Sequence, residues 1–146
     1  MKVLLATDGS EYSQAGVDEV ANRSFPPNTQ VRIVSAYKKT SLTMHMEPMG
    51  ALHEYYVEID KQALKSAEDA TEQAAKILRK GNSLSITTTV IEGSPKSVIL
   101  EEAEKFGADL IVVGSHGYGV VKGFLLGSVS LAVALHAKCS VEIVRK

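Results

Sequence analysis

Cysteine is almost absent from this sequence. Cys139 is the only one, so no disulfide can form within the chain, and a lone thiol fits a reducing compartment better than secretion. Free cysteine usually packs as a small buried hydrophobic side chain. We therefore interpret Cys139 as a packing residue and not as a redox centre.

Long apolar runs are missing as well. The chain begins with a short apolar segment, but the polar residues 7–10 follow too soon for the hydrophobic core of a signal peptide. No stretch approaches the ~20 apolar residues that a membrane helix needs. We expect a cytoplasmic protein that does not enter a membrane.

A surplus of either charge is also lacking. Sixteen Lys and Arg against seventeen Asp and Glu give a formal net charge of -1. This balance provides no positive field to attract a nucleic-acid backbone, so no nucleic-acid partner is expected. The hydrophobic fraction of 45% and the length of 146 residues are those of one folded domain, which we expect to span residues 1–146.

What the sequence does contain is a regular series of strand patterns. Residues 2–6 and 109–113 are apolar on both faces, which is typical of strands buried in a parallel sheet. Residues 30–37 and 141–144 indicate two more strands. Residues 84–91 alternate apolar side chains with Ser and Thr, which predicts a half-buried strand.

Four helices are expected between these strands. The first follows Ser10, which can act as its N-cap, and the longest spans 51–80, with Gly81-Asn82 after it. The third begins at Ser94-Pro95 and ends at Gly107, and the last spans 125–137. This order implies right-handed crossovers and a Rossmann-like α/β fold, a five-stranded parallel sheet with helices on both faces.

Ligands of such sheets bind at the carboxyl ends of the strands, where Asp8, Ala36 and Gly114 fall. A glycine-rich loop from Gly114 to Ser130 starts at this edge. Glycines let backbone N–H groups approach an anion, and a helix opening at 127–128 would add its positive end. We interpret the loop as a phosphate cradle. The alternative is a surface loop whose glycines only form turns.

The loop resembles that of the universal stress protein family, in its ATP-binding branch. Gly114, Gly117, Gly127 and Ser128 match the branch's pattern of Gly, two residues, Gly, nine residues, then Gly and Ser or Thr. The strand and turn at 3–10 extend the resemblance, which covers essentially the whole chain. It implies a fold like that of the adenine nucleotide alpha hydrolases and ATP as ligand, accompanied by Mg²⁺ or Mn²⁺.

The resemblance also implies a set of site residues. Asp8, with Ala6 and Thr7, would lie at the adenine and ribose, and the backbone of Ala36 at the adenine edge. The phosphates would be bound by loop residues, namely Gly114, Ser115, His116, Gly117, Gly127, Ser128, Val129 and Ser130. Asp8 has a physical case of its own, because a carboxylate at a strand end can accept from ribose hydroxyls. It could instead cap the first helix.

Two further groups of residues leave alternatives open. Met44, His45, Met46 and Met49 could bind Cu(I), although we interpret them as ordinary side chains of a polar, Met-rich loop at 38–50. Lys122 could neutralise a phosphate or point to solvent.

Three classes of function remain. The first is a binding module, a nucleotide-responsive stress or signalling protein whose ATP occupancy alters its shape or partners. The second is a slow ATP hydrolase or phosphotransferase, which the sequence favours less because no arginine lies in the loop. The third is a nucleotide-free dimer. The last strand is expected at a sheet edge that can pair with another chain, and the resemblance implies a homodimer joined there. Ser140 departs from the family, which often has proline before this strand.

Overall fold

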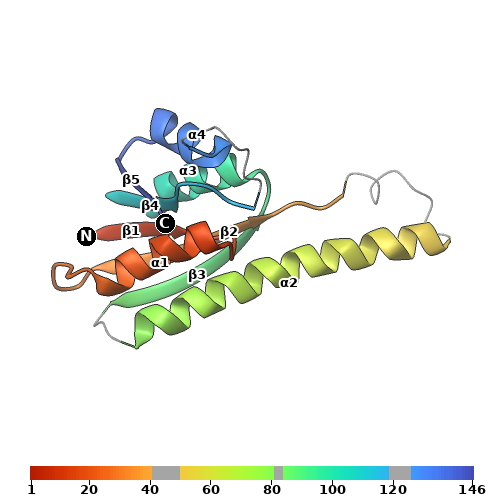
Figure 1. Ribbon diagram of the computed structural model, residues 1–146, viewed down its shortest axis with the longest axis horizontal. Helices are drawn as coiled ribbons and strands as arrows, with labels where there is room; N and C mark the ends of the chain where they lie inside the picture. Colours follow the sequence, from red (N-terminus) through yellow and green to blue (C-terminus); the bar gives the residue numbers. More distant parts are fainter. Residues whose placement is uncertain (41–49, 81–83, 119–125) are drawn as a thin grey trace.

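The structure is a computed structural model that describes residues 1–40, 50–80, 84–118 and 126–146 (Figure 1). Gly81-Asn82, Lys122 and the Met-rich cluster lie outside these residues. The strands are β1 (Lys2–Ala6), β2 (Gln30–Tyr37), β3 (Ser85–Glu92), β4 (Leu110–Gly114) and β5 (Ser140–Val144). The helices are α1 (Glu11–Asn22), α2 (Ala51–Arg79), α3 (Pro95–Phe106) and α4 (Ser128–His136).

The five strands form one parallel sheet in the order β3-β2-β1-β4-β5. The chain moves outward from β1 to β3 and then crosses back to β4 and β5 on the other side of β1. The order therefore reverses between β1 and β4, the position at which open α/β sheets form a ligand crevice. The predicted sheet is confirmed, and β5 lies at its edge as expected.

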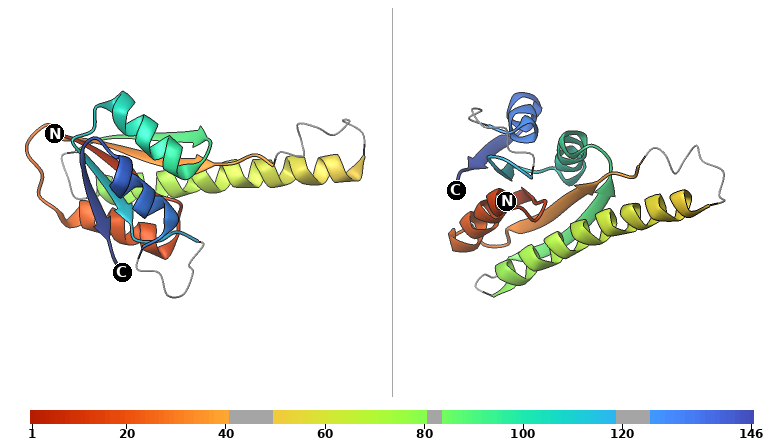
Figure 2. Two further views of the ribbon diagram at one scale, coloured as in Figure 1. Left: turned by 90° about the horizontal axis from the view of Figure 1, so that it is seen from above. Right: turned by 45° about the vertical axis from the view of Figure 1, so that its right-hand side comes forward.

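Helices cover both faces of the sheet, as the sequence predicted. α1 and α2 pack on one face and α3 and α4 on the other (Figures 1 and 2). Successive side chains of a strand point to opposite faces, so β1 divides between two cores. Val3 and Leu5 join the core under α1 and α2, while Leu4 and Ala6 join the core under α3 and α4.

Local signals place the helix ends. The backbone N–H of Ser13 donates to Ser10 Oγ at 3.2 Å, so the predicted N-cap of α1 is confirmed. Pro95 is the first residue of α3, and Gly107 ends that helix in the left-handed conformation at φ 67°. Ser94 stands at the N-cap position of α3 but makes no side-chain capping bond.

The last helix starts later than predicted. The sequence predicted a helix from residue 125, but α4 begins at Ser128, so residues 126 and 127 were wrongly placed in the helix. Gly127 is extended, with φ -71° and ψ 159°, and its N–H donates to Ser115 O at 2.8 Å. The apolar pair before Gly127 predicted a helix, but the backbone bond to Ser115, the residue after β4, holds Gly127 outside it.

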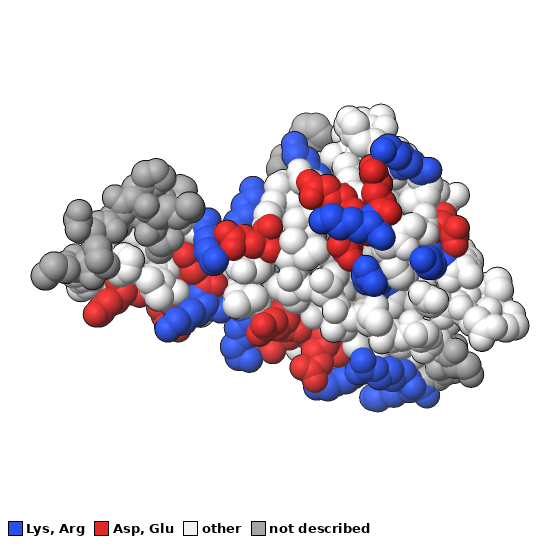
Figure 3. Space-filling view, turned by 180° about the vertical axis from the view of Figure 1, so that it is seen from behind, with Lys and Arg blue, Asp and Glu red and all other residues white. Residues whose placement is uncertain are grey.

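α2 is much longer than the strands that it covers. It has 29 residues, and its amino-terminal part extends beyond the sheet in Figures 1 and 2. Leu52 and Tyr55 there are 54% and 61% exposed, whereas the buried positions of α2 begin at Ala67. Among the described residues no helix combines the length and apolarity needed to cross a bilayer. Acidic and basic side chains are interspersed on the face shown in Figure 3.

Candidate functional site

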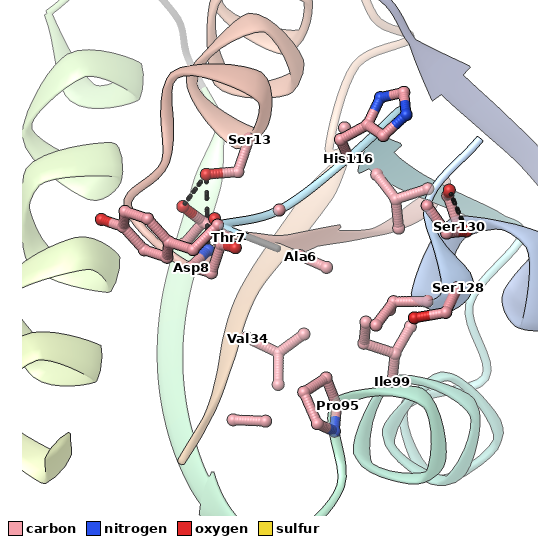
Figure 4. A pocket seen from close by; sticks show the side chains of 17 residues that line it. Ala6, Thr7, Asp8, Ser13, Val34, Pro95, Ile99, His116, Ser128 and Ser130 are labelled. Atoms are coloured by element: carbon pink, nitrogen blue, oxygen red, sulfur yellow. Dashed lines mark hydrogen bonds between the residues drawn. The ribbon is translucent and has the colours of Figure 1, made fainter. Parts of the chain in front are cut away.

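A cavity of about 220 Å³ opens at the carboxyl ends of β1, β2 and β4 (Figure 4). It lies where the strand order reverses. Its walls also include the start of α3, the segment after β4 and the start of α4. Segments distant in sequence therefore meet at the sheet edge that the topology marks for a ligand.

The cavity has an apolar side and a polar side. Figure 4 shows Val34, Pro95 and Ile99 gathered on one side, and Ser13 and His116 on the other. Ala6, Ala36, Val113 and Val129 add to the apolar lining, and Thr7, Asp8, Ser128 and Ser130 to the polar lining. Such a surface can bury a flat apolar group while its rim binds a polar or charged one.

Most of the residues that the sequence singled out line this cavity. They are Ala6, Thr7, Asp8, Ala36, Gly114, His116, Gly117, Gly127, Ser128, Val129 and Ser130. Ser115 does not line it and is only 3% exposed. Its N–H donates to Val144 O at 2.8 Å, and its C=O accepts from Gly127 N at 2.8 Å and from Ser130 Oγ at 2.9 Å. Ser115 thus ties the end of β5 to the start of α4.

The turn after β1 is fixed by a network of hydroxyls. Thr7 Oγ1 lies 3.1 Å from Ser13 Oγ and accepts from the N–H of Gly9 at 3.2 Å. Asp8 Oδ1 accepts from the N–H of Ser10 at 2.9 Å. Ser10 is the N-cap, so Asp8 supports the turn before α1 with one carboxylate oxygen and retains the other at the cavity. Ser10, and not Asp8, caps α1, so the alternative interpretation of Asp8 as the helix cap is wrong, although Asp8 Oδ1 holds the turn before the cap.

Two positions of the loop require glycine for different steric reasons. A Cβ on Gly114 would lie 2.4 Å from Tyr12 O and 2.9 Å from Ser13 N, so the backbone of α1 fills the space of its side chain. A Cβ on Gly117 would lie 2.6 Å from Asp8 Oδ2. The sequence assigned both glycines to phosphate approach. The structure shows that Gly114 is required by helix packing, and that Gly117 makes room for the Asp8 carboxylate.

The amino terminus of α4 faces the cavity. Its N-cap is Gly127, which has no side chain to cap the helix. Ser128 is exposed there, and Val129 lines the wall. Ser130 Oγ is 2.9 Å from both Ser115 O and Gly127 O, so this hydroxyl already bonds within the loop. The positive end of the helix dipole favours an anion at this position.

His116 is held from two sides. Its Nδ1 lies 3.2 Å from Ser115 Oγ, and its ring centroid lies 5.2 Å from that of Tyr12. These contacts orient the imidazole at the polar side of the cavity. Cys139 lies away from the cavity, and burial raises the pKa of its thiol. A raised pKa lowers the thiolate fraction at neutral pH, which supports its interpretation as a packing residue.

Sequence reasoning missed six residues of the lining, which are Ser13, Val34, Pro95, Ile99, Val113 and Tyr118. Pro95 and Ile99 could have been found. They begin the helix after β3, and helices that follow parallel strands start at the same edge as the site. Tyr118 carried no signal beyond its place in the loop. Among the described residues, no three of His, Cys, Asp and Glu gather into a possible metal site.

Comparisons with known proteins agree with this architecture. The sequence matches the model of the universal stress protein family over residues 1–145. Universal stress protein YxiE of Bacillus subtilis is 33% identical over 150 residues, which cover 99% of this chain and 98% of that protein.

Solved structures extend the comparison. Universal stress protein UspA from Lactobacillus plantarum superposes with a TM-score of 0.82 at 23% identity, over 99% of this chain and 97% of that one. A universal stress protein crystallised in complex with cAMP has a TM-score of 0.63 at 30% identity, over 99% and 96% of the two chains.

Proposed function

Since this chain belongs to the universal stress protein family, we propose that it is an ATP-binding member, a single-domain module of residues 1–146 whose nucleotide occupancy alters its shape or its partners. One observation carries the proposal. The cavity at the strand-order reversal joins an apolar wall to an amino-terminal helix end within one concave surface. The cAMP complex of a relative with 30% identity supports an adenine nucleotide as the ligand class.

The apolar wall suits the base. Val34, Pro95 and Ile99 can bury the two faces of a purine, and burial of apolar surface contributes roughly 25 cal/mol per Å². The backbone of Ala36, at the end of β2, is then available to the edge of the adenine. Asp8 Oδ2 would accept from a ribose hydroxyl while Oδ1 continues to hold the turn.

The polar wall suits the phosphates. Backbone N–H groups of Ser128, Val129 and Ser130 open α4, and the Ser128 hydroxyl adds a donor at the cavity. Gly117 and His116 face the same space from the segment after β4. We assign the phosphate chain to this wall, with the Ser130 hydroxyl excluded because it already bonds within the loop.

Mg²⁺ or Mn²⁺ would accompany the nucleotide. Because the described residues contain no cluster of three metal-ligating side chains, the ion would be held mainly by phosphate oxygens and water, a common arrangement for Mg²⁺. The described residues at the cavity therefore fit a metal that is brought by ATP. We further infer that the protein acts in the cytoplasm.

The slow-hydrolysis alternative has less support. The four arginines of the chain are absent from the cavity lining. Arg23 bonds both oxygens of Glu142 at 2.7 Å, which raises the pKa of its guanidinium, and Arg32 bonds Glu102 at 2.7 Å. Guanidinium groups engaged in this way are not available to stabilise a transferring phosphoryl group.

Calorimetry with a panel of nucleotides tests the proposal. We expect ATP with Mg²⁺ to bind with low-micromolar or tighter affinity, and ADP, AMP and cAMP to bind more weakly, because the loop offers more donors than one phosphate can use. GTP serves as the control for the base. A folded protein that gives no heat with any adenine nucleotide contradicts the proposal. Tighter binding of cAMP than of ATP would retain the ligand class and contradict the preference for a triphosphate.

A further inference from the structure

We propose that Tyr118 is a further nucleotide-contacting residue, which covers the sugar side of the cavity and shields the Asp8 carboxylate from water when a nucleotide is bound. This inference rests on the proposed function and adds a residue to it. Tyr118 lines the cavity, yet its side chain is 75% exposed, more than any other large hydrophobic residue among those described. Tyr55 is also exposed, but it lies on α2 and does not line the cavity.

The space beside two glycines shows that Tyr118 lies near the β1 turn that carries Asp8. The position of a Cβ on Gly117 is 2.6 Å from Asp8 Oδ2, and the position of a Cβ on Gly9 is 3.3 Å from the hydroxyl of Tyr118. The β1 turn therefore lies close to the segment after β4, and Asp8, Gly117 and Tyr118 all line the same cavity. Gly9 has φ +79°, so a side chain there would be strained as well as close to the tyrosine hydroxyl.

The chemistry of Asp8 explains what a cover would do. Asp8 is exposed, and a hydrogen bond from a ribose hydroxyl to its Oδ2 competes with water. The same bond becomes stronger when water is excluded. A tyrosine ring provides a large contact area, and fixing it loses little conformational entropy because the side chain has few rotatable bonds. Its hydroxyl already lies near Gly9, so the ring can cover the sugar while the polar tip stays at the rim.

Surface plasmon resonance with Mg²⁺-ATP passed over the immobilised protein measures the effect. We expect Tyr118→Ala to raise the dissociation rate of ATP about tenfold, which corresponds to about 1.4 kcal/mol, and Tyr118→Phe to remain close to the wild type because it keeps the ring. Tyr55→Ala is the matched control, an exposed tyrosine outside the cavity, and should not alter the rate.

Sugar analogues separate a cover from a structural residue. The wild type should bind 2′-deoxy-ATP or 3′-deoxy-ATP less tightly than ATP, and this preference should narrow in Tyr118→Ala, because Asp8 is then open to water. The melting temperature without ligand should not change. An unchanged dissociation rate, an unchanged sugar preference or an equal loss of melting temperature in both Tyr118 variants would overturn the inference. Failure of the wild type to bind ATP at all would instead overturn the proposed function.

Discussion

At the scale of single residues, Gly117 separates two explanations of the loop. The sequence predicted that its backbone approaches a phosphate. In the structure the space next to its Cα is taken by Asp8 Oδ2. A side chain at 117 would therefore act first on the carboxylate, and only through it on the ligand.

We expect Gly117→Ala to weaken ATP binding about tenfold or more, because the new methyl group must displace the Asp8 carboxylate from the cavity. Unfolding stability should change little, since Asp8 is exposed and its loss from the wall leaves the core intact. Calorimetry on Gly117→Ala, Asp8→Ala and the double variant checks this. The double variant should bind no worse than Asp8→Ala alone. Fully additive losses would show that Gly117 contacts the ligand directly, as the sequence indicated.

How far the site could be predicted depended on where each residue lies in the chain. Asp8 and the glycine loop follow strands directly, so the parallel topology alone placed them at one edge. Pro95 and Ile99 enter the same cavity from the helix after β3, and the same topological rule could have placed the start of that helix at the site edge. The burial of Ser115 could not be predicted, because it depends on hydrogen bonds to residues more than ten positions away.

At the scale of secondary structure elements, the contact between α1 and β4 has a glycine on each side. A Cβ on Gly114 would meet the backbone of Tyr12 at 2.4 Å. A Cβ on Gly16 would lie 3.7 Å from Leu5 and Val112, which is ordinary packing distance. The two glycines face each other across the same contact but differ in what they tolerate.

We expect Gly114→Ala to lower the free energy of unfolding by about 1–3 kcal/mol or more, because α1 must move away from the sheet. Gly16→Ala is the matched control and should be neutral or stabilise by up to ~1 kcal/mol, since alanine is the better helix former. Urea unfolding of both variants measures the difference. Equal stabilities would mean that α1 can shift without cost, and would contradict the packing described here.

The elements themselves were largely predictable, and the exceptions have local causes. Apolar runs and capping residues gave the strands and the starts of α1 and α3, because each signal acts within a few residues. The predicted start of α4 was wrong because the N–H of Gly127 bonds to Ser115, just after β4, instead of continuing a helix. Periodicity detects apolar spacing, but it cannot detect a backbone bond between segments.

At the scale of the whole molecule, we infer a homodimer joined through β5. Within the described part of the chain, β5 pairs with β4 alone. The N–H of Ser115 donates to Val144 O, so the backbone groups of Val144 face β4. Backbone groups alternate along a strand, and those of Ile143 therefore point outward, to the side where an edge strand can receive another chain.

We expect Ile143→Pro to yield a monomer, because proline removes an outward donor without removing a bond to β4. Ile143→Ala is the matched control. It loses the same side-chain packing but keeps the N–H, so it should remain dimeric. Sedimentation equilibrium distinguishes the two. A dimeric Ile143→Pro would place the interface elsewhere, and a monomeric Ile143→Ala would mean that side-chain packing, and not strand pairing, holds the subunits together.

Ser115 lies between the β5 edge and the start of α4, which borders the nucleotide cavity. Its N–H bonds the last residue of β5, and its C=O bonds the residues that open α4. If a ligand shifts the opening of α4, these hydrogen bonds would pass the shift to β5, and a partner that fixes β5 would act on α4 in return. Such coupling is reciprocal, so the free energy by which occupancy alters association equals the free energy by which association alters occupancy.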